Sequence, residues 1–362
     1  MRILWLAHRD PKNPRSGGAE RTIYEVCTRL LKKGYRITLI TGGWKGCKRK
    51  EELNGIEIYR FGKNIGPHFA LPIFLLKNHF DLIVNDLGHA IPWSFSVLLN
   101  KHNVAFFRHL HARSLTGQVG QILARTIAAI ERCYFIFYHY TIFVTESTTS
   151  MQDLIHLGIN YGKIVMIPPG VDRNVFHPSE KSKYPSIVYF GGMRKYKRPS
   201  EVLYLLNTLI EIVDNVRLFV IGTGPEESGL KKLANELNIQ KYVEFKGRLS
   251  IEELSAIVAA SWLNIHTSVT EGWGYTILEA SAAGTPTVAY NVPGIKDAVQ
   301  DDFNGLKVED GNREALAEAT LKILKEPERW WSSSIEVAKK YSWETTADSW
   351  DNLIKRLVTI SK

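Results

Sequence analysis

Residues 271–279 (EGWGYTILE) combine side-chain types that could bind a phosphorylated sugar. They place Glu271 on a glycine-rich loop and Glu279 two turns into the helix that we expect to begin there. Free backbone N–H groups around residues 273–276 would mark the positive end of that helix, a favourable place for a phosphate. Two carboxylates beside a phosphate repel it, whereas each of them can bind hydroxyl groups of an attached sugar. The spacing therefore predicts a nucleotide-sugar site, with the diphosphate at the amides, the donor sugar near Glu271 and the ribose near Glu279.

Two glutamates eight residues apart would also fit a solvated helix face in any α/β protein. Glu279, however, lies within the apolar run YTILEASAAG, where an unpaired carboxylate is costly to bury. We therefore expect a partner for Glu279, and this expectation favours the binding interpretation.

Glycine pairs follow expected strands at two other places. Gly17 and Gly18 precede a helix expected over residues 19–33, where they would let a phosphate approach the backbone. A tight turn explains them equally well. The segment GTGPEE, which starts at Gly222, begins like a dinucleotide fingerprint but has Glu227 at the third glycine position, so the NAD interpretation is weak.

A basic loop, residues 191–199 (GGMRKYKRP), follows the first strand expected in the second half of the chain. Its four cations lie where a parallel strand ends, which is a typical setting for a diphosphate. A solvated basic loop is the alternative. In the first half, His109 and His111 end another strand and could accept hydrogen bonds from a sugar or orient an acceptor, although structural histidines are commoner.

Short apolar runs alternate with helical segments along the whole chain and must position these residues. The runs lie at residues 2–8, 36–41, 56–61, 81–86, 104–109, 140–146 and 163–168, and again at residues 186–192, 216–222, 242–247, 262–268, 285–290 and 305–310. Near-continuous apolar strands separated by helices indicate parallel sheets covered on both faces. Two such sets predict two doubly wound, Rossmann-like α/β domains, and 362 residues are enough for two cores.

Residues 167–185 are rich in proline and charge and have no clear period, so we place the domain break there. This gives an N-terminal domain at residues 1–170 and a C-terminal domain at residues 171–342. An amphipathic helix is expected over residues 343–358.

The positive charge is concentrated in the first half. Residues 1–170 hold 22 Lys and Arg against 11 Asp and Glu, a net charge of +11, and residues 171–362 hold 24 against 26, a net charge of −2. Charge alone is compatible with nucleic acid, with an anionic membrane leaflet or with a merely solvated basic surface. Three cysteines without CxxC spacing argue against a disulfide framework and a zinc site, and they favour a reducing cytosol.

Several segments in this order resemble the family 4 glycosyltransferases, which are retaining enzymes with the GT-B fold. The segments are GGAER, FVTES, KIVMIPPGVDRNVFHP, YKRP, VIGTGPEE, VEFKGRLS and EGWGYTILEASAAGTPTVAY, and they span nearly the whole chain. The resemblance implies two Rossmann-like domains facing a central cleft and a C-terminal helix, residues 343–362, that returns to the N-terminal domain.

The resemblance also implies roles for individual residues. Glu271 would lie near the donor sugar, Lys197 would neutralise the diphosphate, and His111, with His109 as second choice, would lie near the transferred sugar. The expected donor-binding set is Gly17, Gly18, Gly192, Gly222, Gly247, Arg248, Leu249, Gly272, Trp273, Gly274, Tyr275, Thr276 and Glu279.

One position departs from the family pattern. Family members usually carry an arginine where this chain has Gly192, and Arg194 is the candidate to supply the missing charge. No D-x-D sequence occurs, so we expect no metal and no cofactor, with the nucleoside-diphosphate sugar as co-substrate. Lys197, Arg194 and the helix amides would stabilise the departing diphosphate.

The acceptor is left open by these residues. The basic first half and the apolar stretch at residues 64–80 favour a glycan or lipid-linked acceptor and a cytoplasmic protein peripheral to an anionic membrane, with no nucleic-acid partner. An ordinary core helix over residues 69–80 is the alternative. A GT-B-fold epimerase or phosphorylase and a non-catalytic nucleotide-binding protein remain the competing functions.

Overall fold

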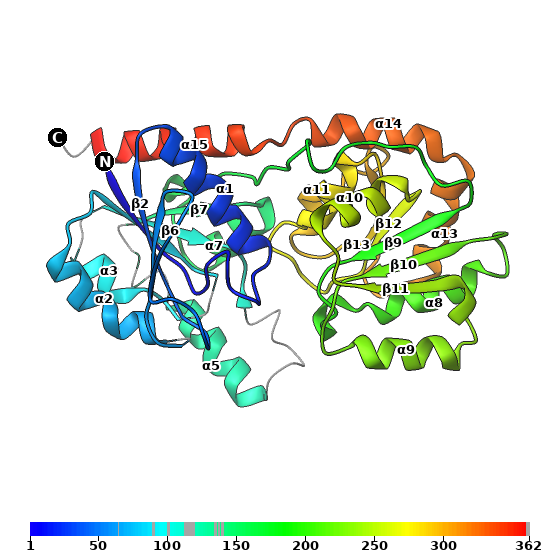
Figure 1. The fold of residues 1–362 in the computed structure, drawn as a ribbon, viewed down its shortest axis with the longest axis horizontal. Helices are drawn as coiled ribbons and strands as arrows, with labels where there is room; N and C mark the ends of the chain where they lie inside the picture. Colours follow the sequence, from blue (N-terminus) through cyan, green and yellow to red (C-terminus); the bar gives the residue numbers. More distant parts are fainter. Residues whose placement is uncertain are drawn as a thin grey trace. The chain divides into compact units, whose positions relative to one another are not determined.

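The computed structural model describes residues 1–63, 65–88, 91–99, 102–111, 120–133, 136, 138 and 141–359. These residues form two compact α/β units, coloured from blue to red along the chain in Figure 1. The first unit contains residues 1–111, 120–170 and 343–359, and the second contains residues 171–342. Among the described residues, no helix is both long enough and apolar enough to cross a bilayer.

An eight-stranded sheet forms the centre of the first unit, in the order β3-β4-β2-β1-β5-β6-β7-β8. Its strands are β1 (Arg2–Leu6), β2 (Arg36–Thr41), β3 (Lys50–Leu53), β4 (Ile56–Arg60), β5 (Leu82–Asp86), β6 (Asn103–Phe107), β7 (Ile142–Thr145) and β8 (Ile164–Met166). All neighbours are parallel except β3, which pairs antiparallel with β4. The charged edge strand β3 was not predicted, because its sequence KEEL carries no run of apolar residues.

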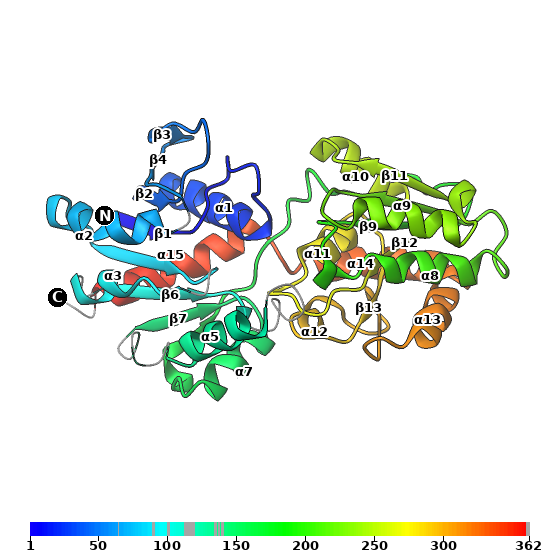
Figure 2. The ribbon, with the colours of Figure 1, turned by 90° about the horizontal axis from the view of Figure 1, so that it is seen from below.

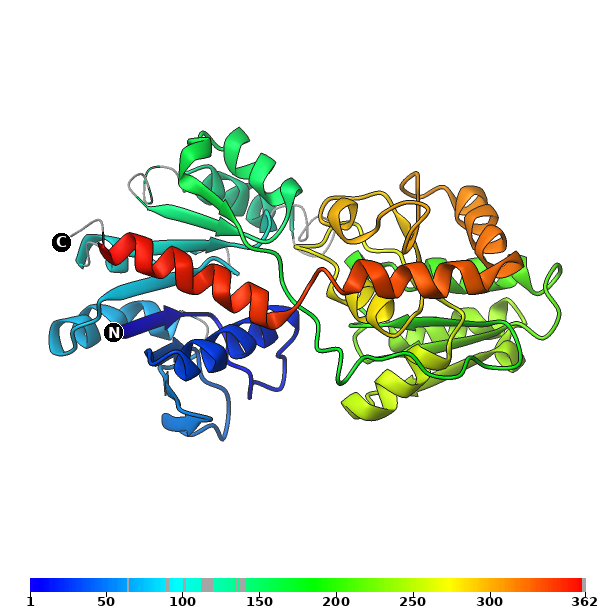
Figure 3. The same cartoon turned by 90° about the horizontal axis from the view of Figure 1, so that it is seen from above.

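Helices cover both faces of this sheet. They are α1 (Gly18–Lys32), α2 (Gly66–Lys77), α3 (Ser94–Leu99), α5 (Gln121–Arg132), α7 (Thr148–His156) and α15 (Trp343–Thr359). The C-terminal helix α15 lies beside α1 on one face (Figure 3). Its Trp350 ring is 5.1 Å from that of Trp5 and 5.2 Å from that of Phe106, so an aromatic cluster attaches the end of the chain to the first unit.

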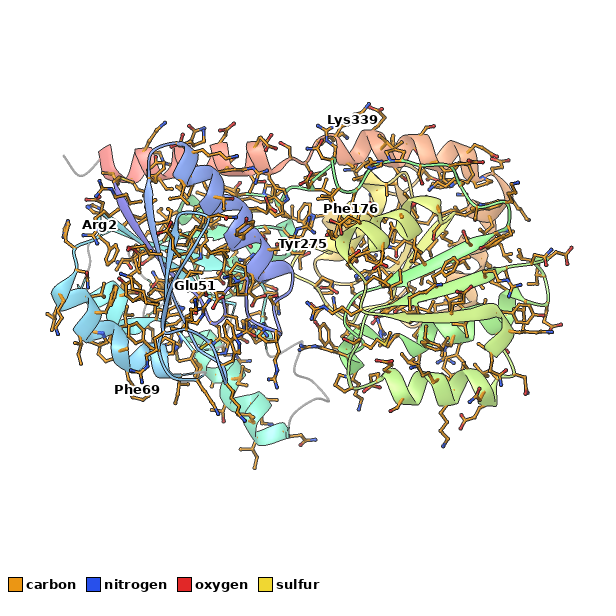
Figure 4. All side chains as sticks on the ribbon, in the orientation of Figure 1. Arg2, Glu51, Phe69, Phe176, Tyr275 and Lys339 are labelled. Carbon is orange, nitrogen blue, oxygen red and sulfur yellow. The ribbon has the colours of Figure 1, made fainter. Side chains whose placement is uncertain are left out.

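Helix α2 exposes an apolar face, which an ordinary core helix would not do. Leu71 is buried, but Phe69 is 74% exposed, Ile73 60% and Leu76 79%. Phe69 points away from the body of the unit (Figure 4). Asn64, the first residue of the apolar stretch considered above, lies outside the described residues.

The second unit contains a six-stranded parallel sheet in the order β11-β10-β9-β12-β13-β14. Its strands are β9 (Ser186–Phe190), β10 (Arg217–Ile221), β11 (Val243–Gly247), β12 (Leu263–His266), β13 (Thr287–Tyr290) and β14 (Gly305–Val308). The side chains of β9, β12 and β13 are all buried, as expected for strands covered on both faces.

Helices again lie on both sides of the sheet (Figures 1 and 2). They are α8 (Ser200–Leu209), α9 (Glu227–Glu236), α10 (Ile251–Ala260), α11 (Tyr275–Ala282), α12 (Ile295–Ala298), α13 (Arg313–Lys325) and α14 (Pro327–Ala338). The loops that carry the predicted site leave the carboxyl ends of β9, β10, β11 and β12, where ligands bind in open α/β sheets.

Candidate functional site

Two glycines in the loop after β10 allow it to pack against the loop after β9. A Cβ atom on Gly222, whose φ is +128°, would lie 1.9 Å from the carbonyl oxygen of Gly191. A Cβ on Gly224 would lie 2.2 Å from the carbonyl oxygen of Met193. The backbone N–H of Met193 donates to the carbonyl of Thr223 at 3.0 Å. Packing between loops therefore accounts for the glycines that resemble a dinucleotide fingerprint.

The basic loop is attached to the loop after β12 by Arg198. This residue has a left-handed φ of +47°, and its guanidinium donates to the carbonyl oxygens of Thr267 at 2.8 Å and Ser268 at 3.1 Å. It also pairs with Asp310. Arg198 was expected among the cations for the diphosphate, but these backbone bonds make it a positioning residue.

Lys197, the next cation of the loop, forms an ion pair with Glu271. The carbonyl oxygen of Lys197 also accepts a hydrogen bond of 2.9 Å from the hydroxyl of Thr267. The side chains of Lys197 and Glu271 are 19% and 14% exposed. Lys197 is therefore not a flexible loop cation, because both its backbone and its ammonium group are held by the neighbouring loop.

Three donors converge on one oxygen of the Glu271 carboxylate. Besides Lys197, the Ser268 hydroxyl donates to Oε1 at 2.6 Å and Nε2 of His266 lies 3.4 Å from the same atom. Oε2 accepts no hydrogen bond from the described residues. The carboxylate is thus anchored through one oxygen, and the other is available for a sugar hydroxyl.

Burial and charge act in opposite directions on this pair. Burial acts to raise the pKa of Glu271, but Lys197 and His266 outweigh it and hold the pKa well below its ordinary value. Burial likewise acts to lower the pKa of Lys197, and attraction to Glu271 outweighs it and raises the pKa. Both groups are therefore charged at neutral pH.

Arg194 lies next to the place of the missing family arginine. It is exposed, and it forms no hydrogen bond or ion pair through its guanidinium with any described residue. A Cβ atom on Gly192 would be 3.9 Å from Cγ and from Nε of Arg194. The positive charge of Arg194 acts to lower the pKa of Lys197, so the two cations are in electrostatic reach of each other.

The start of α11 is shaped by glycine at two positions. Gly274, with φ of +89°, is the N-cap of the helix. Gly294 lies so close to the Glu271 backbone that a Cβ there would be 2.0 Å from the Glu271 carbonyl oxygen. The N–H of Glu271 donates to the Pro293 carbonyl at 2.9 Å, so this Pro-Gly turn fixes the backbone of the glutamate.

The remaining predicted residues of this region divide between core and loop. Trp273 is 3% exposed and its ring lies 5.4 Å from that of Tyr341, so its side chain packs inside the unit. Tyr275 and Thr276 begin α11 after Gly272 and Gly274, and Glu279 is half-buried on the same helix. Gly247, Arg248 and Leu249 connect β11 to α10, with Gly247 at φ of +64°.

The predicted residues of the first unit lie at the start of α1 and after β6. The N–H of Gly17 donates to Oε2 of Glu20 at 2.7 Å, while Arg9 donates to Oε1 at 2.8 Å. Gly17 has a negative φ of −148°, and a Cβ there would meet only Glu20, at 3.9 Å, among the described residues. The fold of this unit therefore does not itself require a glycine at position 17. Gly18 is the first residue of the helix.

His111 is oriented by a buried carboxylate that the sequence did not reveal. Oε1 of Glu131, on α5, accepts the backbone N–H of His111 at 2.5 Å and lies 3.0 Å from its Nδ1. Because a carboxylate only accepts here, the proton of the histidine is expected on Nδ1. The ring centroid of His109 is 5.0 Å away. The sequence feature that could have revealed this role is an acidic residue, Glu131, within a helix that has a strong apolar face.

His266 and Ser268 are the other functional candidates that sequence reasoning missed. His266 is 6% exposed, and its Nδ1 is buried without a hydrogen-bond partner among the described residues. Both residues sit at the carboxyl end of β12, in the run NIHTS, where polar side chains interrupt a buried strand. That position could have identified them.

Comparisons with known proteins identify the family of the chain. The family Glycosyl transferases group 1 matches residues 171–340, and Glycosyltransferase Family 4 matches residues 16–175. A D-inositol 3-phosphate glycosyltransferase from Corynebacterium aurimucosum is 24% identical over 354 residues, covering 90% of this chain and 82% of the relative. A GDP-mannose-dependent alpha-(1-6)-phosphatidylinositol monomannoside mannosyltransferase from Mycobacterium tuberculosis is 24% identical, covering 98% and 97%.

Solved structures share the fold over nearly the full length. A sucrose-phosphate synthase from Thermosynechococcus elongatus superposes with a TM-score of 0.84 at 19% identity and covers 99% of both chains. WaaG, a glycosyltransferase involved in lipopolysaccharide biosynthesis, superposes with a TM-score of 0.78 at 18% identity, covering 97% of this chain and 99% of WaaG. The predicted fold class and enzyme class are confirmed: the chain is a GT-B-fold glycosyltransferase and belongs to the family 4 glycosyltransferases.

Proposed function

We propose that this glycosyltransferase moves a sugar from a nucleoside-diphosphate sugar to a hydroxyl acceptor with retention at the anomeric carbon. The observation that carries the proposal is the Lys197–Glu271 pair, in which the carboxylate is held at one oxygen by Lys197, Ser268 and His266. A pair built in this way presents a cation for the diphosphate next to a carboxylate oxygen for the sugar.

Donor binding would use residues of the second unit in three places. The diphosphate contacts Lys197, Arg194 and the backbone amides at the start of α11, the donor sugar contacts Glu271, and the ribose contacts Glu279. Two similar proteins support this class of donor by their names. One relative is described as GDP-mannose-dependent, and the similar Anabaena protein HepE was solved in complex with UDP and glucose.

The charge change during the reaction explains the choice of side chains. As the bond from the anomeric carbon to the diphosphate breaks, the leaving group takes the electron pair and gains negative charge. Lys197, which is held in place by Glu271, stabilises that charge as a preorganised donor, and Arg194 adds a second positive charge beside it. The acceptor oxygen bonds to the anomeric carbon on the same face, and its proton passes to the leaving phosphate. This route needs no nucleophile from the protein.

The acceptor we propose is a lipid-linked glycan or glycolipid reached at the cytoplasmic face of a membrane. The apolar face of α2 is exposed at Phe69, Ile73 and Leu76, and α3 adds Phe95 and Leu98, which are 50% and 78% exposed. The first unit also has more Lys and Arg than Asp and Glu. Exposed apolar side chains on such a positively charged unit are suited to binding an anionic membrane surface. The mannosyltransferase relative is named for a phosphatidylinositol monomannoside.

We further propose that transfer requires no metal. Lys197 and Arg194 would supply the positive charge that neutralises the diphosphate in place of a metal ion. Activity in excess EDTA is expected to stay within about twofold of the untreated enzyme. If EDTA abolished activity and Mg²⁺ or Mn²⁺ restored it, the proposal that Lys197 and Arg194 neutralise the diphosphate would be wrong.

A donor panel tests the proposal directly. The protein is incubated with UDP-, GDP- and ADP-sugars, with and without a glycolipid extract as acceptor, and release of nucleoside diphosphate is measured together with the anomeric configuration of the product. We expect acceptor-dependent release and a retained configuration. Epimerised sugar nucleotide, release of sugar 1-phosphate, or tight NADH binding without sugar-nucleotide binding would each overturn the assignment in favour of a competing function.

A further inference from the structure

A pocket of about 380 Å³ lies in the first unit, between the loop after β1 and the loop after β2. Among the described residues that line it, every side chain with a full charge is a cation. These cations are Arg9, Arg15, Lys45 and Lys63. The indole of Trp44 and the imidazole of His8 also line the pocket.

The loop after β1 is held in place by its own hydrogen bonds. Asp10 accepts the backbone N–H of Lys12 at 3.0 Å through its carboxylate and that of Asn13 at 3.0 Å through its carbonyl. The amide oxygen of Asn13 accepts the backbone N–H of Arg15 at 2.9 Å. The backbone that carries Arg15 is therefore ordered without any ligand.

The loop after β2 is equally constrained. The N–H of Gly43 donates to the Gly62 carbonyl at 2.7 Å, and a Cβ on Gly43 would lie 3.0 Å from that oxygen and from Sγ of Cys47. The guanidinium of Arg60 stacks 4.7 Å from the Trp44 ring. These contacts fix the indole that forms one wall of the pocket.

The acidic side chains near the pocket are already paired with other groups. The buried carboxylate of Asp10 binds Arg60 with two hydrogen bonds of 2.8 and 3.0 Å, and Glu51 binds the same guanidinium at 2.9 Å. Glu20 pairs with Arg9 at 2.8 Å. Among the described residues the lining itself contains no carboxylate, and these three neighbouring carboxylates are paired with Arg60 and Arg9.

Three cations of the pocket are thus uncompensated. Arg15, Lys45 and Lys63 are exposed and form no ion pair with any described residue. His8 adds no charge, because burial, followed by the charge of Arg9 and the nearby His68 and His111, lowers its pKa to about 4. Three like charges around one concavity repel each other, and an anion between them removes that repulsion.

We infer that this pocket binds a phosphate group carried by the acceptor. The inference rests on the proposed function, because it deepens the account of what the first unit recognises. A tetrahedral dianion between Arg15, Lys45 and Lys63 would accept charge-assisted hydrogen bonds, and the Trp44 ring would contact the attached sugar or glycerol.

Binding of inorganic phosphate, measured by calorimetry without any donor, tests the inference. The measurement uses a Lys197→Ala background, which removes the cation expected to bind the donor diphosphate. Arg15→Glu combined with Lys45→Glu is expected to weaken phosphate binding at least about tenfold, the effect of losing one charge-assisted hydrogen bond. Binding should also weaken as salt is added.

Lys48→Glu combined with Arg49→Glu is the matched control, because it changes the charge of the same unit equally without lining the pocket. The control should bind phosphate like its parent, and circular dichroism should show both variants folded. Equal binding by the pocket variant and its control, or no phosphate binding by the parent, would overturn the inference.

Two further measurements identify the source of the phosphate and separate this inference from the proposed function. Glucose 1-phosphate and dihexanoyl phosphatidic acid below its micelle concentration are compared, and the tighter ligand shows whether a sugar or a lipid carries the group. In transfer assays with Lys197 intact, Arg15→Glu combined with Lys45→Glu should raise the acceptor KM and leave kcat nearly unchanged. Phosphate binding that depends on Arg15 and Lys45, in a protein that transfers no sugar, would sustain the pocket and reject the proposed function.

Discussion

The two units treat their charged side chains differently. In the second unit, Lys197 and Glu271 are partly buried as an ion pair, and Ser268 and His266 hold the same carboxylate oxygen. In the first unit, Arg15, Lys45 and Lys63 stay exposed around a pocket and helix α2 presents apolar side chains to solvent.

This difference suggests how each unit meets its ligand. A donor site must stabilise charge that develops during the reaction, so its groups gain from being fixed in advance. A surface that binds a large acceptor can instead leave its cations and apolar side chains exposed in the free protein. The acceptor then gains binding energy when it covers them.

The largest expected effect comes from removing the fixed cation. Lys197→Ala should lower kcat by roughly 10²–10³, because a preorganised donor to a developing anion is lost. The variant also leaves Glu271 without its charged partner, so its thermal stability should fall as well. Lys232→Ala, at an exposed lysine on α9, is the control and should behave like the wild type. Turnover close to that of the wild type in Lys197→Ala would remove the main argument for a prearranged donor site.

The second-largest effect is expected from Arg194, the candidate substitute for the family arginine at position 192. Arg194→Ala should lower kcat/KM by about tenfold, which corresponds to about 1.4 kcal/mol. Adding Gly192→Arg to this variant should restore most of the loss, since among the described residues a Cβ at position 192 meets nothing closer than Arg194 itself, at 3.9 Å. If Arg194→Ala lowered kcat/KM less than threefold, or if Gly192→Arg did not restore activity to it, Arg194 would not be the substitute for the family arginine.

The third effect tests the exposed apolar face. Co-sedimentation with anionic vesicles should weaken about tenfold or more in Phe69→Ser with Leu76→Ser, because burial of such side chains is worth about 1.5–3 kcal/mol each. Replacing Lys48, Arg49 and Lys50 by Glu should weaken it further, by about 1 kcal/mol for each charge near the surface.

Ile212→Ser with Phe303→Ser is the matched control for the apolar face, since these side chains of the second unit are 60% and 59% exposed. The control should bind vesicles as the wild type does, and the binding of both proteins should weaken as salt is added. Equal and negligible binding of the wild type to anionic and neutral vesicles at low salt would remove the membrane hypothesis and favour an anionic soluble acceptor.

The smallest effect is the pH dependence of the buried pair. The folded-state pKa of Glu271 is lowered, so its contribution to stability is present above the unfolded value of about 4.5 and is lost as the pH falls through the folded pKa. The folded-state pKa of Lys197 is raised above 10.5, so its contribution is present below that value and is lost at higher pH. The Tm difference between wild type and Lys197→Met with Glu271→Gln should therefore be constant between about pH 6 and 9 and change below pH 4.5. A difference that does not vary from pH 7 to pH 3 would show that the two groups are not coupled in the native state.

The chain's local patterns predicted its strands well. Runs such as RITLIT at residues 36–41 and TPTVAY at residues 285–290 lie on buried parallel strands, because a strand covered on both faces must be apolar throughout. Strand β3 was missed because its sequence KEEL has three charged residues and a single apolar one, which an edge strand tolerates. The exposure of α2 was left open because a run of apolar residues does not show what will cover it.

The sequence by itself determined the class of the site: a carboxylate on a glycine-rich loop, a basic loop after a strand, and their order along the chain. Tertiary structure decided how those residues are used. The Arg198 guanidinium binds backbone carbonyls of the loop after β12, and Oε1 of Glu271 is occupied by Lys197, which comes from a different loop. Likewise, Glu131 reaches His111 from a helix that begins ten residues after it. Spacing encodes which groups share a segment, but hydrogen bonds and ion pairs between segments depend on packing that brings distant residues within a few ångströms.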